Sequence, residues 1–68
     1  MSGTGKALHD WQTFKRELGI VNKDVDYMRI NLGFSLPDSF IEEDCREIVS
    51  SLEKCEKAVA SILKEMKP

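Results

Sequence analysis

The residues best suited to chemistry in this chain are two cysteines and one histidine. Cys45 and Cys55 are the only thiols among 68 residues, and His9 is the only histidine. If both cysteines lie on one helix, their ten-residue separation corresponds to about 15 Å, which is too far for a disulfide. One histidine and two such distant thiols cannot complete a tetrahedral zinc site. We therefore predict two reduced thiols, both buried as small hydrophobic side chains and unreactive, and no metal.

Three other groupings that suggest chemistry have simpler explanations. Residues 3–6 (Gly-Thr-Gly-Lys) match only part of a phosphate-binding loop, and we expect a flexible tail over residues 1–5. His9 and Asp10 are neighbours, so on a helix their side chains point about 100° apart, and no nucleophile is tied to them. The acidic residues 42–44 lack the spacing of a calcium loop and suit the first turns of a helix. We predict no catalytic residue, no cofactor and no enzymatic activity.

Charge and hydropathy exclude several classes of protein. The chain has 10 basic and 12 acidic residues, a net charge of −2 and a pI near 5.3, so it lacks the basic excess of a nucleic-acid-binding protein. No apolar run approaches the ~20 residues that cross a bilayer, and the first residues lack the apolar stretch of a secretory signal. We expect one small helical domain over residues 1–68, soluble, intracellular and cytoplasmic, with no nucleic-acid partner and no membrane insertion.

An unbroken heptad pattern of apolar residues runs from residue 41 to residue 66. Its steps alternate between four and three residues, the period of a helix face that packs against other helices. Pro37 precedes a suitable N-cap at Ser39, and Glu42 completes a capping box. We predict one long helix over residues 39–66. Its apolar face contains Ile41, Cys45, Ile48, Leu52, Cys55, Val59, Ile62 and Met66, and it is widened by Val49 and Leu63.

The breadth of this face indicates assembly with other helices. Branched residues at the d positions, among them Ile41 and Ile48, suit a parallel two-stranded coiled coil poorly and favour a bundle. A helix over 39–66 is also about 42 Å long, longer than either short helix expected in the first half of the chain. We predict a small helical subunit that associates with itself or with another protein helix. The candidate interface and core residues are Trp11, Phe14, Ile41, Ile48, Val49, Leu52, Cys55, Val59, Ile62, Leu63 and Met66.

The first half of the chain predicts two shorter helices, over residues 4–18 and 22–33. Each segment has apolar residues at steps of four, three and four, and Gly19 and Gly33 are suitable stops. Residues 27–34 also alternate between apolar and other side chains, as a half-buried strand would. Helix and strand both stay open there, and we favour helix because a lone strand would have no partner. The predicted fold is an all-α small helical bundle of two short helices and one long C-terminal helix.

Two local resemblances suggest other functions. Cys45 and Cys55, with nine residues between them, resemble one half of the twin C-x9-C helical hairpins of the mitochondrial intermembrane space, although the second cysteine pair is missing. Residues 27–32 and the long helix resemble the C-terminal end of fold-type I pyridoxal-phosphate aminotransferases. That resemblance implies a carboxylate-binding role for Arg29 in a detached subdomain of an enzyme, since the lysine-bearing domain is missing. A further hypothesis is a thiol-dependent regulatory factor that uses one of the cysteines.

Overall fold

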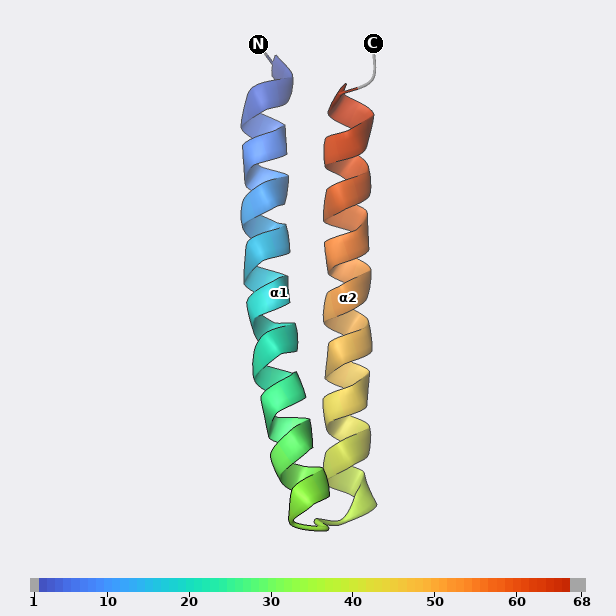
Figure 1. Ribbon diagram of the computed structural model, residues 1–68. Helices are drawn as coiled ribbons and strands as arrows, with labels where there is room; N and C mark the ends of the chain where they lie inside the picture. Colours follow the sequence, from blue (N-terminus) through green and yellow to red (C-terminus); the bar gives the residue numbers. More distant parts are fainter. Residues whose placement is uncertain (1, 67–68) are drawn as a thin grey trace.

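The computed structural model describes residues 2–66, which form two helices. α1 comprises Ser2–Gly33 and α2 comprises Asp38–Met66. The helices run antiparallel, side by side along their whole length, so the start of α1 and the end of α2 lie at the same end (Figure 1). Measured on Cα atoms, the molecule is 52 Å long and only 13 by 11 Å across. It is a long, thin helical hairpin in which each helix has one neighbour.

The all-α class is confirmed, but the prediction of two short helices in the first half is wrong. α1 continues through Gly19 and through residues 27–33, where a strand was the alternative. The apolar patterns of the two segments are in phase, because Leu18 and Val21 are three residues apart. A mid-helix glycine costs about 1 kcal/mol, which is less than an extended packed face provides. α1 has 32 residues and α2 has 29, so the expected contrast in helix length is not found.

The start of α1 also differs from the sequence prediction. Residues 2–5, assigned above to a flexible tail, belong to the helix. Glycines lower helix propensity there, but no proline interrupts the backbone hydrogen bonds. Met1, the first residue of that predicted tail, lies outside the described residues, as do Lys67 and Pro68.

A Schellman motif ends α1. The Ser35 N–H donates to the Leu32 carbonyl at 3.2 Å, and the Leu36 N–H donates to the Asn31 carbonyl at 3.0 Å. Ser35 has φ 53°, the left-handed conformation that glycine usually supplies at this position. The predicted stop, Gly33, is the last residue of α1. The chain therefore reverses at a serine.

α2 begins directly after Pro37. Its first residue is Asp38, one position before the predicted cap at Ser39. The Phe40 N–H donates to the Pro37 carbonyl at 3.1 Å and closes the first turn. Pro37 itself lies just before the helix, where its missing N–H leaves no intrahelical hydrogen bond unmade.

Ion pairs between the helices show how they are aligned. The pairs are Lys6–Glu65 at 3.8 Å, Glu17–Lys54 at 3.9 Å and Lys23–Glu47 at 4.0 Å. In each pair the two residue numbers add to 70 or 71. Residue i of α1 is thus level with roughly residue 71 − i of α2. Near the loop, the side-chain amide of Asn31 donates to the Asp44 carboxylate at 2.7 Å.

The contact between the helices is only partly apolar. Each helix contributes two lines of residues at seven-residue spacing, and these lines are buried or half-buried. Within the described residues, no large side chain is fully buried. The apolar lines are Ala7, Phe14, Val21 and Met28 in α1, and Ile41, Ile48, Cys55 and Ile62 in α2; the second lines are Asp10, Glu17, Asp24 and Asn31 in α1, and Asp44, Ser51 and Ala58 in α2.

Candidate functional site

The hairpin divides the predicted apolar face of α2 into a buried line and an exposed line. The line that contains Cys55 packs against α1, and the Cys55 thiol donates to the Phe14 carbonyl at 3.7 Å. Leu52 and Val59 are each 46% exposed. Cys45 belongs to this exposed line, so the prediction that both thiols are buried is wrong for Cys45. The reason is geometric, since one neighbouring helix covers only part of a stripe about 100° wide.

α1 has a matching exposed line. Its members follow each other at seven-residue spacing, and each directly follows a polar contact residue. Leu18 follows Glu17 and is 38% exposed, and Val25 follows Asp24 and is 50% exposed. A step of one residue is a rotation of about 100° around the helix axis. These side chains therefore point out of the contact toward one side of the hairpin.

The exposed lines of α1 and α2 lie on the same side of the hairpin. In α2 the step is identical, because Leu52 follows Ser51 and Val59 follows Ala58. Equal rotations on two antiparallel helices turn side chains toward the same side. We call this surface the apolar flank. It consists of Trp11, Leu18, Val25 and Leu32 of α1 and Cys45, Leu52, Val59 and Met66 of α2, with Leu8, Val49 and Leu63 beside them.

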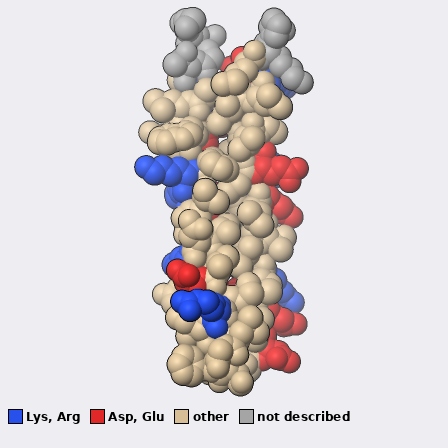
Figure 2. Space-filling view, viewed as in Figure 1, with Lys and Arg blue, Asp and Glu red and all other residues tan. Residues whose placement is uncertain are grey.

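The two edges of the apolar flank carry opposite charge. Lys15 and Arg29 lie along the α1 edge, four residues after Trp11 and Val25. Lys15 Nζ is 5.2 Å from the centroid of the Trp11 ring, a cation–π contact. The α2 edge carries the acidic residues 42 and 56. Figure 2 shows a face that is mainly uncharged along both helices, with most of the basic side chains at the α1 side and most of the acidic ones at the α2 side.

The opposite flank holds the ion pairs between the helices. Lys23 and Glu47, and Glu17 and Lys54, reach across it. Lys23, Glu47 and Lys54 sit on the other side of the contact lines, by the same rotation argument, whereas Glu17 belongs to a contact line. We call this surface the charged flank, and its ion pairs form within a single chain.

Buried carboxylates lie between the flanks, at the helix contact. Glu17 and Asp24 are each 4% exposed. Lys54 Nζ lies 3.9 Å from a Glu17 oxygen, which is an ion pair but is too long for a hydrogen bond. One oxygen of each of these two carboxylates, and one of Asp10, has no hydrogen-bond partner among the described residues. A hydrogen bond with Asp24 and the charge of that carboxyl raise the pKa of Glu47 above its ordinary value of 4.5. Burying carboxylates in this way costs stability.

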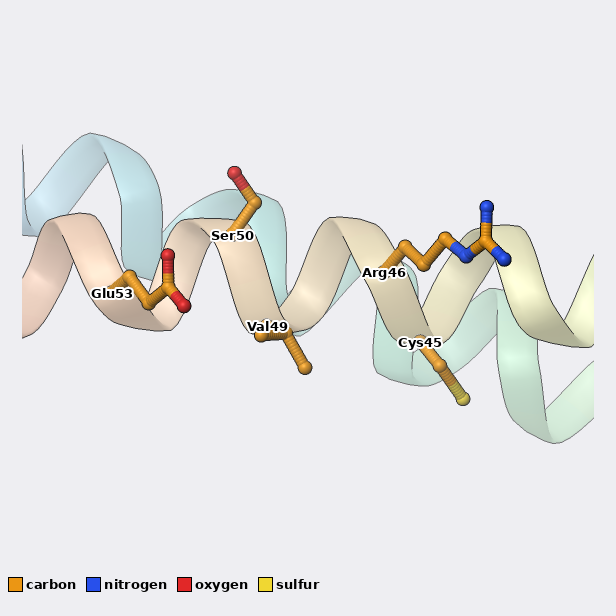
Figure 3. A pocket seen from close by; sticks show the side chains of 5 residues that line it. All are labelled: Cys45, Arg46, Val49, Ser50 and Glu53. Carbon is orange, nitrogen blue, oxygen red and sulfur yellow. The ribbon is translucent and has the colours of Figure 1, made fainter.

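Two hollows on the described part of the surface are widely open to solvent. One, of about 290 Å³, is lined only by α2, and in Figure 3 Cys45 and Val49 point to one side while Ser50 points to the other. Because a single helix forms its wall, it cannot enclose a ligand as binding pockets do. A second hollow, of about 270 Å³, lies between the helices and is lined by Asp10, Thr13, Lys54, Lys57 and Ala58.

The structure separates the predicted interface residues into two groups. Phe14, Ile41, Ile48, Cys55 and Ile62 lie at the helix contact, whereas Trp11, Val49, Leu52, Val59, Leu63 and Met66 are exposed. Sequence reasoning did not list four members of the apolar flank, Leu18, Val25, Leu32 and Cys45, as interface candidates. The signal was present, because the two heptad patterns of α1 join without a change of phase.

Arg29 does not have the setting that the aminotransferase resemblance implies. It is an exposed residue of α1, and residues 27–33 are helical. In the described part of the chain, no three His, Cys, Asp or Glu side chains are grouped to hold a metal ion. Neither helix, over residues 2–66, has a stretch apolar enough to cross a membrane. Comparisons of the chain with protein-family models, curated proteins and solved structures find no match.

Proposed function

We propose that this chain is a helical assembly module that binds protein helices through its apolar flank. The observation that carries the proposal is the apolar flank itself, in which two lines of large apolar side chains lie side by side and exposed. Contiguous apolar surface of this extent usually marks an interaction site. In this proposal the module holds helices together and has no cofactor and no catalytic step.

The chemistry of the rest of the surface supports this function. The hollow beside Cys45 is walled by a single helix, and Glu17 and Asp24 lie buried at the helix contact. The charged flank is internally paired, so it offers less to a partner. An apolar strip between charged edges is the surface that a helix in a bundle presents to its neighbours.

We further propose that the module works inside the cell with reduced thiols, in the cytoplasm. Cys45 and Cys55 both belong to α2, and α1 contains no cysteine. A C-x9-C hairpin needs cysteines on both helices so that disulfides can join them. This arrangement argues against the intermembrane-space alternative.

Replacing one flank residue by aspartate tests the proposal. We expect Leu52→Asp to abolish association, because a lone carboxylate is costly to bury in an apolar interface. The matched control is Ala60→Asp, which adds the same charge at an exposed position of α2 away from the flank. The measurements are sedimentation equilibrium over a concentration series, and recovery of bound proteins from cell extract with each variant as bait.

The outcomes of this test are distinct. Association with itself or with an extract protein that is lost in Leu52→Asp and kept in Ala60→Asp supports the assembly function. A chain that stays monomeric and recovers no partner, or that associates equally well in both variants, overturns it.

A further inference from the structure

We infer that the partner of the apolar flank is a second copy of this chain, related by a two-fold axis parallel to the helices. This inference rests on the proposed function and names its partner. The assembly is a four-helix bundle in which α1 of each copy packs against α2 of the other. Three features of the hairpin support it: the charges at the edges of the apolar flank, the alignment of the helices and the area of the flank.

The first feature is the charge of the two edges. The α1 edge carries Lys15 and Arg29, and the α2 edge carries Glu42 and Glu56. A two-fold axis parallel to the helices places the α1 edge of one copy on the α2 edge of the other. Basic side chains then face acidic ones along both edges. A two-fold axis perpendicular to the helices would instead place the basic α1 edges of the two copies on each other, and likewise the acidic α2 edges.

The second feature is the alignment of the helices. A parallel two-fold axis does not shift heights along the bundle, so the alignment within one hairpin also holds between the copies. Residue i of α1 is then level with roughly residue 71 − i of the second copy's α2. Four consecutive edge positions meet in this way. The pairs are Leu8 with Leu63, Lys15 with Glu56, Asn22 with Val49, and Arg29 with Glu42.

All four pairs are compatible. Two are opposite charges, one is leucine against leucine, and one sets a small polar side chain beside a valine. The two-fold axis repeats each pair, so the dimer contains every contact twice. The central lines of the flank, which include Leu18, Val25, Leu52 and Val59, meet between these edges and form the core.

The third feature is the area of the flank. A footprint of 52 by 13 Å on Cα atoms is roughly 700 Å², the same order as the ~800 Å² of accessible surface that each partner buries in a standard stable interface. The length and width of the hairpin are therefore sufficient for a specific dimer. It is also more apolar than the rest of the surface, as homodimer interfaces are.

A charge-exchange experiment tests this arrangement. The variant Lys15→Glu with Arg29→Glu should self-associate at least about tenfold more weakly, because four attractions become repulsions. The variant Glu42→Lys with Glu56→Lys should be weakened in the same way. An equimolar mixture of the two should regain dimers of near wild-type affinity, since every edge pair again joins opposite charges. The control, Arg46→Glu with Lys57→Glu, has the net charge of the first variant and should dimerise like the wild type.

A disulfide experiment tests the alignment independently. Leu8→Cys combined with Leu63→Cys, in a chain carrying Cys45→Ser and Cys55→Ala, should give a covalent dimer on mild oxidation. The two new thiols lie at opposite edges of the flank within one hairpin, so they meet only between copies. The control, Gln12→Cys with Leu63→Cys, places one thiol on the outer surface of α1 and should not cross-link efficiently.

The result expected for the wild-type chain is a mass of twice 7.7 kDa, with rescue in the mixture and the cross-link from residue 8 to residue 63. A wild-type chain that is monomeric from micromolar to millimolar concentration overturns the inference. So does a larger oligomer, or a mixture that associates no better than its components. If that monomer still recovers an extract protein through a Leu52-dependent contact, the assembly function stands and only the second copy is rejected.

Discussion

The helix contact buries polar side chains and the apolar flank exposes apolar ones, which is the reverse of the usual distribution in a folded protein. At the contact, Glu17 and Asp24 are each 4% exposed, while the next residues, Leu18 and Val25, are 38% and 50% exposed. Carboxylates are almost never buried without full pairing, and large apolar side chains usually are buried. The difference shows that a single neighbouring helix cannot cover the whole width of the apolar stripe of α1, or of the stripe of α2. The hairpin covers half of each stripe, and mostly polar side chains, among them Asp24 and Ser51, fill the remainder of the contact.

A helix in a four-helix bundle has two neighbours that lie at roughly a right angle around it. A stripe about 100° wide matches this environment, because each half of the stripe meets a different neighbour. In this hairpin the half that contains Val21 and Cys55 is buried. The half that contains Val25 and Leu52 is exposed. The following predictions test this difference between the contact and the flank, in order of expected size.

The largest effect should come from placing a charge at the contact. Val21 is 9% exposed and lies beside two carboxylates, so Val21→Asp should lower the free energy of unfolding by about 3–4 kcal/mol. Val25→Asp is the matched change on the flank, and in dilute solution it should cost less than about 1 kcal/mol. Urea unfolding followed by circular dichroism at low concentration gives both values. Equal losses would mean that the contact and the flank are not distinct environments.

The two thiols should react at very different rates. Cys45 is exposed and Cys55 is buried, so labelling of Cys55 requires the hairpin to open. We expect Cys45 to react about 100-fold faster in dilute solution, which corresponds to an opening free energy of a few kcal/mol. Raising the protein concentration should lower the labelling rate of Cys45 if the flank becomes covered by association. The labelling rate of Cys55 should stay low at every concentration. Single-thiol variants Cys45→Ser and Cys55→Ala assign the two rates, and comparable rates would contradict the burial difference.

The loop should allow stability to be changed without touching the contact or the flank. Ser35 has φ 53°, which costs a non-glycine residue about 1 kcal/mol. Ser35→Gly should therefore raise the free energy of unfolding by about 0.5–1 kcal/mol. Association should be unchanged, because the flank keeps all its side chains. The control Ser39→Gly lies in the first turn of α2, where glycine should be destabilising. A loss of stability in Ser35→Gly would contradict the turn geometry.

The smallest effect concerns pH. The pKa of Glu47 is raised above 4.5, first by a hydrogen bond with Asp24 and then by the charge of that carboxyl. The folded hairpin therefore binds this proton more tightly than the unfolded chain does. The stabilisation is fully present below pH 4.5 and is lost as pH rises through the folded-state pKa. Between pH 4.5 and the folded-state pKa of Glu47, the free energy of unfolding of the wild type should fall relative to that of Glu47→Gln. Glu53→Gln, at an exposed position of α2, should follow the wild type, and parallel curves for all three would refute the coupling.

The helices and their apolar faces could be predicted from the sequence, because steps of four and three residues report helical periodicity directly. The number of helices could not be predicted, since Gly19 has the form of a stop and only packing against α2 carries the helix past it. Periodicity also does not reveal which half of a stripe is buried. Leu52 and Cys55 are equivalent in the pattern and differ only because α1 lies on one side.

The buried carboxylates were the least predictable feature. Glu17 and Asp24 lie just outside the apolar stripe of α1, where a sequence pattern assigns a solvated position. They are buried because the contact between two helices is not centred on that stripe. Ser35 was missed for a related reason. Gly33, two residues earlier, led to the prediction of a stop there, but the position of the left-handed residue is set by where the chain must reverse.

The shared position of the two ends of the hairpin has a mechanical consequence. The start of α1 and the end of α2 lie beside each other, far from the loop (Figure 1). A pulling force applied between residue 2 and residue 66 therefore acts across the helix contact and not along it. It separates the helices turn by turn, beginning at the Lys6–Glu65 pair and reaching the Asn31–Asp44 hydrogen bond last. Each step breaks only a few contacts, so the hairpin should open at low force, in contrast to helices that are loaded in shear.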